Sequence, residues 1–159
     1  MKKRIIIGLL GGLAIISTTG CGNKTTKPFT ITCKGENDAV EGAKITNTSI
    51  YYFDKDQTIT GYDATSVNVY DDDKTYEAYK EAIETTINNN TADVEYSIKT
   101  EPSIRTITLI YKVKITKEML KNLKDKDYYN PTTVIERAET KTNTKAKCTI
   151  EGAKRSQLK

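Results

Sequence analysis

Several segments of this 159-residue chain alternate apolar and polar residues, which is the pattern of a strand with one buried face. The longest run extends from Ile107 to Ile115, and its unbroken apolar face predicts a strand in a central position of a sheet. Shorter runs predict strands that begin at Phe29 and at Val94, and a last strand over 146–150. Segments rich in strand-forming residues over 48–53 and 58–70, separated by a polar turn, predict a hairpin.

One strong helical pattern lies between this hairpin and the strand at Val94. Apolar residues recur at three- and four-residue spacing from Tyr76 to Ile87, so we expect the main helix over about 73–90. Thr116 can cap a short helix further on, and the spacing of Thr133 and Glu136 is that of a capping box that opens another. The predicted fold class is therefore α+β: an antiparallel sheet of about five to six strands, the main helix packed on one face, and one or two short C-terminal helices.

The N-terminus has the layout of an export signal. Three basic residues at 2–4 precede residues 5–16, which carry no charge and are too few to span a membrane. Small residues at 17–20 then lead into Gly20-Cys21, which resembles the lipobox of bacterial lipoproteins, although Thr18 stands where that family usually has Leu. The resemblance implies cleavage after Gly20 and a lipid on Cys21; the alternative is a secreted, unanchored protein cut elsewhere in 17–20.

Cleavage divides the chain and removes most of its positive charge. Residues 1–20 are the predicted signal peptide, 21–28 a flexible tether, and 29–159 a single globular domain in which 152–159 is expected to be frayed. The whole chain has 25 basic and 21 acidic residues, and three of the basic ones leave with the signal, so the mature chain has 22 and 21. A net charge of +1 gives no support for nucleic-acid binding.

Two cysteines remain once Cys21 is assigned to the lipid. Cys33 and Cys148 lie on the apolar faces of the first and last predicted strands, and disulfides persist outside the cytosol. If the two strands are neighbours, a disulfide joins the two ends of the domain; the alternative is a pair of buried thiols.

The layout resembles the YehR-like family of small bacterial lipoproteins. The matching features are Gly20-Cys21, Cys33 on the first strand, the segment 75–79 that starts the main helix, and Cys148 near the C-terminus. The resemblance implies a compact α+β domain with a helix packed on an antiparallel sheet. The family has no established activity, so the resemblance implies no catalytic residues.

The residue types present exclude several chemistries. The chain has no histidine, which removes the usual general base and nearly every transition-metal site. Aspartates at 54 and 56, at 71–73, and at 125 and 127 could in principle bind calcium, but a loop that starts at Asp54 has Ile59 where an EF-hand needs glycine. We interpret them as turn and capping residues, and we expect no metal, no cofactor and no catalytic residue.

Tyrosine is the unusual residue type, with 10 Tyr against 2 Phe and no Trp. The adjacent pairs Tyr51-Tyr52 and Tyr128-Tyr129 are candidates for a binding surface, because tyrosine suits surfaces that contact proteins or sugars; packing at the edge of the core is the alternative. The leading hypothesis is a non-enzymatic lipoprotein, anchored in the cell membrane on its extracytoplasmic face, that binds an envelope protein or glycan. The alternatives are an envelope hydrolase or lyase that uses carboxylates or tyrosine, and a purely structural lipoprotein.

Overall fold

A computed structural model of the chain describes residues 25–37, 41–88, 94–123, 127–140 and 146–158. The predicted signal peptide, Cys21, Asp125 and the first residues of the tether lie outside the described residues.

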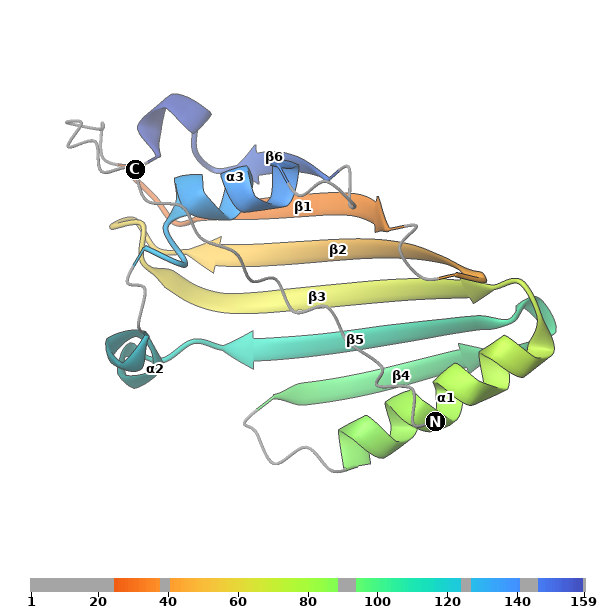
Figure 1. Cartoon of the computed structure of the whole chain (residues 1–159). Coiled ribbons are helices and arrows are strands. Elements are labelled where there is room, and N and C mark those ends of the chain that lie inside the picture. The colour runs from red at the N-terminus through yellow and green to blue at the C-terminus, as the bar shows by residue number, and fades with distance from the viewer. Residues whose placement is uncertain (1–24, 38–40, 89–93, 124–126, 141–145, 159) are drawn as a thin grey trace.

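The domain is built on one six-stranded antiparallel sheet (Figure 1), which confirms the predicted fold class. The strand order across the sheet is β4-β5-β3-β2-β1-β6. The strands are β1 (Phe29–Asn37), β2 (Ala43–Phe53), β3 (Ile59–Tyr70), β4 (Glu95–Glu101), β5 (Thr106–Lys114) and β6 (Lys147–Glu151). The prediction that the 107–115 strand is central was wrong, because β5 is second from one edge and the longer strands β2 and β3 form the centre.

Within the described residues, three α-helices accompany the sheet: α1 (Asp73–Asn88), α2 (Lys117–Asn122) and α3 (Pro131–Thr140). Asp72 accepts hydrogen bonds from the backbone N–H and the hydroxyl of Thr75, both at 2.8 Å, and thereby caps α1. The Thr116 hydroxyl caps α2 by accepting from the backbone N–H of Met119 at 3.2 Å. None of the helices in the described ranges is both long and apolar enough to cross a membrane.

The predicted start of α3 needs correction. The helix begins at Pro131, before the expected capping box at Thr133 and Glu136. Asn130 acts at its N-terminus, where Oδ1 accepts hydrogen bonds from the Thr132 backbone N–H at 3.0 Å and from its hydroxyl at 2.7 Å. An asparagine followed by proline is a stronger start signal, because the asparagine satisfies free amide groups and the proline ring fixes a helical φ.

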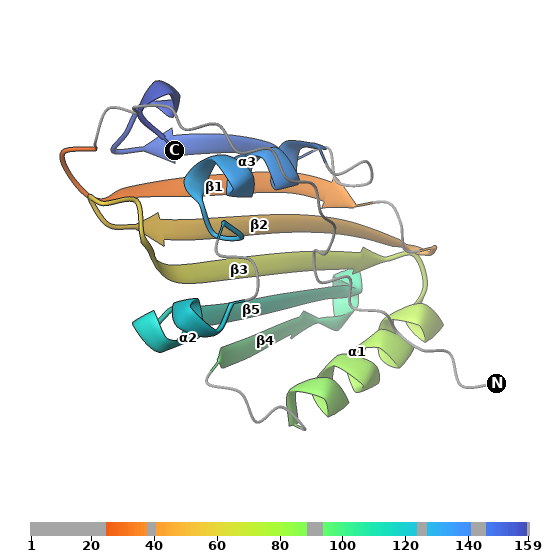
Figure 2. The same ribbon diagram turned by 60° about the vertical axis from the view of Figure 1, so that its left-hand side comes forward.

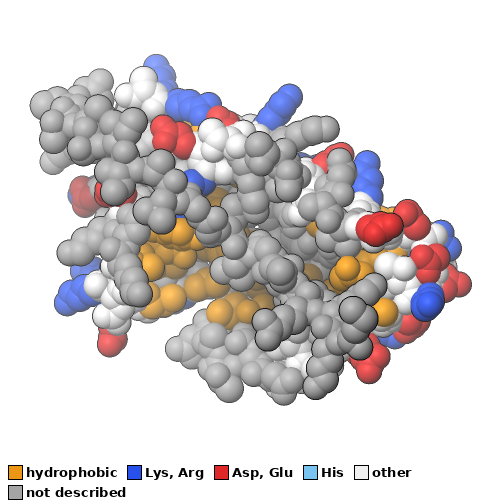
Figure 3. Space-filling model, viewed as in Figure 1, with side chains coloured by type: hydrophobic (Ala, Val, Ile, Leu, Met, Phe, Trp, Pro, Cys, Tyr) orange, Lys and Arg blue, Asp and Glu red, His pale blue; other side chains and the backbone are white. Residues whose placement is uncertain are grey.

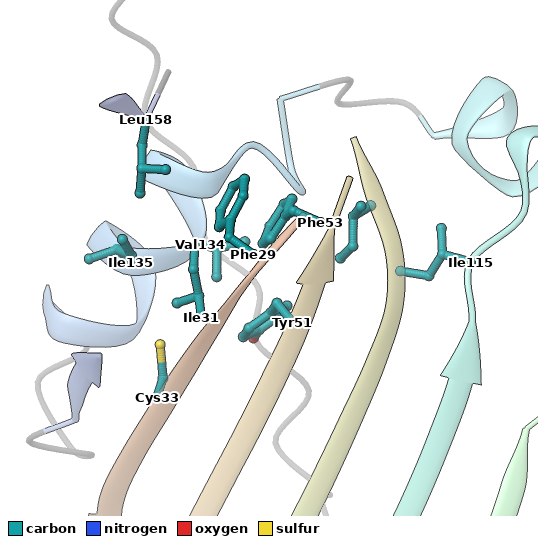
Figure 4. Packing of buried hydrophobic residues seen from close by; sticks show 10 residues of the cluster. Phe29, Ile31, Cys33, Tyr51, Phe53, Ile115, Val134, Ile135 and Leu158 are labelled. Carbon is teal, nitrogen blue, oxygen red and sulfur yellow. The ribbon is translucent and has the colours of Figure 1, made fainter. Parts of the chain in front are cut away.

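Both longer helices pack on the same face of the sheet, which we call the helix face (Figure 2). Under α3, Phe29, Ile31 and Phe53 form the larger core with side chains of the helix such as Val134 (Figure 4). A smaller core under α1 contains Tyr70, Tyr76 and Ile107. In the described part of the chain no helix packs on the opposite side, which we call the open face.

The first and last strands are joined covalently. Cys33 and Cys148 are direct cross-strand partners of β1 and β6, with Cα atoms 4.0 Å apart, and their sulfur atoms form a disulfide. The predicted bridge is therefore confirmed. In such a close pair the backbone N–H groups point away from the neighbouring strand. The Cys148 N–H accordingly donates to Glu139 Oε1 of α3 at 3.3 Å, and Arg155 donates to the other oxygen of that carboxylate at 2.6 Å.

The C-terminal segment is packed against the domain, so the prediction that 152–159 is frayed was wrong for its described part, 152–158. The chain reverses at Gly152, whose φ is +94°, and forms a short 3-10 helix over Arg155–Gln157. Leu158 then inserts into the larger core and is 8% exposed. One apolar side chain after a polar run is a weak pattern, but its burial stabilises the segment.

The described end of the tether is also held in place. Thr25 is buried, and its hydroxyl donates to the backbone carbonyl of Lys55, in the turn between β2 and β3, at 2.6 Å. The part of the tether that can act as a free linker is therefore shorter than the predicted 21–28.

Candidate functional site

Four tyrosines form a row across the helix face, and we call them the tyrosine row. Tyr51 of β2 is the cross-strand partner of Tyr62 of β3, and Tyr111 of β5 is the partner of Tyr96 of β4. The ring centroids are 4.8 Å apart between Tyr51 and Tyr62, 5.7 Å between Tyr62 and Tyr111, and 6.1 Å between Tyr111 and Tyr96. The row therefore crosses four of the six strands as a continuous series of ring contacts that begins in the core at Tyr51 and ends at Tyr96.

The hydroxyl groups of Tyr62 and Tyr111, in the middle of the row, are hydrogen-bonded to each other. Tyr62 Oη is 3.2 Å from Ser49 Oγ and 3.2 Å from Tyr111 Oη, and either atom of each pair can donate. Every hydroxyl carries one donor and two acceptor positions, so such a chain retains acceptor positions for a ligand. The row thus offers ring faces and hydroxyl groups side by side.

Two tyrosines of the row, Tyr51 and Tyr111, have shifted pKa values. Burial raises the pKa of Tyr51 and Tyr111 well above the ordinary value of 10, and in both cases the neighbouring Tyr62 raises it further. Because a phenolate is needed for a tyrosine to act as a base or nucleophile, these two are suited to binding and not to that chemistry.

An arginine lies close to the Tyr51 end of the row. Tyr128 and Tyr129, in the turn before α3, contact each other edge to face at 4.8 Å between centroids. The Arg137 guanidinium carbon lies 3.7 Å from the centroid of the Tyr128 ring, a cation–π contact. Its charge partly offsets the effect of burial on the pKa of Tyr51. Among the described residues, the buried Nε and Nη1 atoms of Arg137 have no hydrogen-bond partner. The cation–π contact with Tyr128 therefore stabilises this buried positive charge.

The helices lie toward opposite corners of the helix face: α3 contacts β1 and β6, and α1 contacts β3 and β5. Hydrophobic side chains gather on this face between them (Figure 3). Within the row, Tyr96 is 39% exposed, Tyr62 and Tyr111 are half-buried, and Tyr51 belongs to the core and is 5% exposed. Tyr96 is therefore the member most accessible to a partner.

The structure does not bring all four predicted tyrosines together. Tyr51, Tyr128 and Tyr129 lie on the helix face, whereas Tyr52 projects from the open face, because successive residues of a strand point to opposite sides. There Tyr52 donates a hydrogen bond to Asp63 at 2.9 Å, beside a shallow hollow of about 430 Å³ that also contains Lys112 and Glu95. Its pKa is raised by burial first and then by this hydrogen bond.

Three members of the row were missed by sequence reasoning: Tyr62, Tyr96 and Tyr111. Tyr96 and Tyr111 fall on the apolar faces of predicted strands, so the alternation placed both correctly toward the helix face, whereas the strand that contains Tyr62 was predicted from its composition and shows no such alternation. The missing information was the pairing of β3 with β5, which the sequence does not contain.

The aspartates that were considered for calcium have structural roles where the structure describes them. Asp54 Oδ1 accepts hydrogen bonds from the backbone N–H groups of Asp56 and Thr58, both at 2.9 Å, and so closes a turn. Hydrogen bonds from Thr75 lower the pKa of Asp72, and hydrogen bonds from Arg155 and from the Cys148 backbone lower that of Glu139. Across the described ranges, no three His, Cys, Asp or Glu side chains are grouped as a metal site would require.

Comparisons with protein-family models, with curated proteins and with solved structures found no match to this chain.

Proposed function

We propose that this protein is a lipoprotein of the cell membrane, anchored on the extracytoplasmic face through Cys21, that binds an envelope protein or glycan through the tyrosine row without catalysing a reaction. The observation that carries the proposal is the row itself: four tyrosines in contact across four strands, with the hydroxyls of Tyr62 and Tyr111 hydrogen-bonded to each other. Membership of the YehR-like family, suggested by the sequence layout, is part of the proposal.

The chemistry of the row suits both kinds of ligand. Tyrosine rings bury a large apolar area at low entropic cost, and their hydroxyls add directional hydrogen bonds, which is why tyrosine is enriched in protein interfaces. The same rings stack on the apolar faces of sugars, while hydroxyls pair with sugar hydroxyls. Burial raises the pKa of Tyr111, so its hydroxyl stays protonated even in mildly alkaline surroundings, whereas the buried Tyr51 supports the row from within the core.

The disulfide supports the proposed location outside the cytosol. Cys33 and Cys148 are bonded in the structure, and structural disulfides persist mainly in compartments outside the cytosol. An exported protein whose mature N-terminus is Cys21 fits this requirement.

The described carboxylates support the non-catalytic part of the proposal. A general acid at neutral pH needs a raised pKa, whereas Asp72 and Glu139, which have shifted values, are both shifted downward by partners with structural roles.

The test uses the anchored protein in intact cells, with a photoreactive phenylalanine analogue in place of Tyr96. Two matched controls carry the analogue at Tyr52, on the open face, and at Ile104, which is 56% exposed and distant from the row. We expect one dominant cross-linked species, protein or glycan, from Tyr96 and not from either control. Equal cross-linking at all three positions, or none at Tyr96, would contradict the proposal.

A second measurement separates binding from folding. Tyr96→Ala removes the most exposed ring of the row and should reduce capture of that species while leaving the thermal unfolding temperature nearly unchanged. Tyr52→Phe, the control on the open face, should bind as the unmodified protein does.

A further inference from the structure

We infer that one end of this domain lies against anionic lipid headgroups and places the tyrosine row beside the membrane surface. The inference rests on the lipid anchor of the proposed function and adds an orientation to it. We call this end the anchor end: it contains Thr25–Pro28, the turn over 54–58, the end of β5 with α2, and the segments 127–131 and 151–158. It lies at the left of Figure 1, where the described chain begins and where α2 and the C-terminus are found.

The length of the tether limits how far this end can lie from the membrane. Three residues lie between Cys21 and Thr25, which makes four Cα–Cα steps, and a fully extended chain spans at most about 3.6 Å per step, so the two Cα atoms are within about 14 Å of each other. Thr25 is buried and bonded to Lys55, which fixes this attachment point on the turn between β2 and β3. An acylated Cys21 therefore holds that turn within one to two Debye lengths (about 8–10 Å each) of the headgroups.

The anchor end and the opposite end of the domain carry net charges of opposite sign. The basic side chains of the anchor end are Lys27, Lys55, Lys114, Lys117, Lys121, Lys154 and Arg155. Its acidic side chains are Asp54, Asp56, Glu118, Asp127 and Glu151. These seven basic and five acidic groups give the described residues of this end a net charge of +2.

The opposite end, which we call the far end, is acidic. Its described segments, 36–37, 41–44, 70–77 and 99–105, carry seven acidic and four basic residues, a net charge of −3. Acidic side chains gather around the point where β3 leads into α1 (Figure 3). An anionic surface attracts the anchor end and repels the far end, so it favours an upright sheet over one that lies flat.

This orientation limits the partners that can reach the tyrosine row. Tyr51 lies two residues before the end of β2 at the anchor end, and Tyr96 is the second residue of β4, which starts there. At about 3.3 Å per residue the row lies about 7 Å inside that end of the sheet. Its ligand is therefore a protein or glycan held close to the membrane surface, and not a polymer that lies far from it.

The absence of tryptophan from the chain allows a direct test. Met119→Trp on α2 at the anchor end and Ile104→Trp at the far end replace side chains that are 44% and 56% exposed, so both should fold normally. The full lipidated protein is placed in phosphatidylcholine vesicles with about one third phosphatidylglycerol and a headgroup-attached nitroxide quencher. We expect several-fold stronger quenching for Met119→Trp than for Ile104→Trp, and a smaller ratio in phosphatidylcholine alone or in high salt.

Flotation of the protein with the vesicles distinguishes a failure of the proposed lipid anchor from a failure of the proposed orientation. Protein that does not float overturns the lipid anchor of the proposed function, whereas protein that floats with equal quenching at both positions overturns only the orientation.

Lys117→Glu combined with Lys121→Glu should lower the quenching ratio. The matched control, Lys74→Glu with Lys99→Glu, makes the same change in net charge at the far end and should not; a ratio that falls equally in both would contradict the role of the anchor-end lysines.

Discussion

Removal of the disulfide tests how much the covalent closure of the sheet contributes to stability. Cys33 and Cys148 are 115 residues apart in sequence, so their bond closes a loop that contains most of the domain. On the chain-entropy relation such a loop restricts the unfolded chain by about 4–5 kcal/mol at 25 °C. Replacement of both residues by alanine also removes two sulfur atoms from the sheet, where Cys33 is 5% exposed, which adds a smaller packing loss.

We therefore expect the Cys33→Ala/Cys148→Ala variant to be less stable by about 3–5 kcal/mol, a large part of the stability of a typical domain. Equilibrium unfolding in urea, followed by circular dichroism, gives the difference. The reduced unmodified protein is the control, because it lacks the bond and keeps both sulfur atoms. If the free energy of unfolding falls by less than about 1 kcal/mol in both the double variant and the reduced protein, the reasoning is refuted. Such a result would show that the unfolded chain gains little freedom when the bond is removed.

Three further predictions concern single features of the fold. Gly152→Ala should destabilise the domain by about 1–2 kcal/mol in urea unfolding, because φ is +94° and an added Cβ would lie 2.9 Å from the Pro28 carbonyl oxygen; a neutral effect would contradict that geometry. Asp72→Ala should lower the melting temperature and the helical circular-dichroism signal by removing the cap of α1, whereas Asp71→Ala, its exposed neighbour, should leave both nearly unchanged. Stability should fall as the pH rises above 10, because burial raises the pKa of Tyr70 to about 12 and tyrosines of the unfolded chain ionise first; a melting temperature that stays constant between pH 9 and about 12 would oppose this.

Much of the architecture was predictable because it depends on local patterns. The three- and four-residue spacing from Tyr76 to Ile87 identified α1, and the alternation around Cys33 and Cys148 placed both sulfur atoms on one face. Errors arose where two local start signals compete, as Asn130 and Thr133 do at the start of α3, or where a single side chain such as Leu158 determines the outcome.

The candidate site was less predictable than the fold. Adjacent tyrosines such as Tyr51 and Tyr52 are conspicuous in the sequence but point to opposite faces. The tyrosines that do meet are separated in the chain, because Tyr62 and Tyr111 become neighbours only through the pairing of β3 with β5. Alternation assigns a side chain to a face, whereas the partner it meets depends on long-range register.

The carboxylate of Glu139 has a consequence for how copies of this protein behave when crowded on a membrane. An incoming strand could extend the sheet at β6 by bonding to its outward N–H and C=O groups, and the N–H of Cys148 is already occupied by Glu139. Because its partners lower the pKa of this carboxylate, the interaction persists in mildly acidic surroundings. Edge-to-edge polymerisation needs two open edges per molecule, so the loss of this donor at β6 disfavours the growth of a fibre.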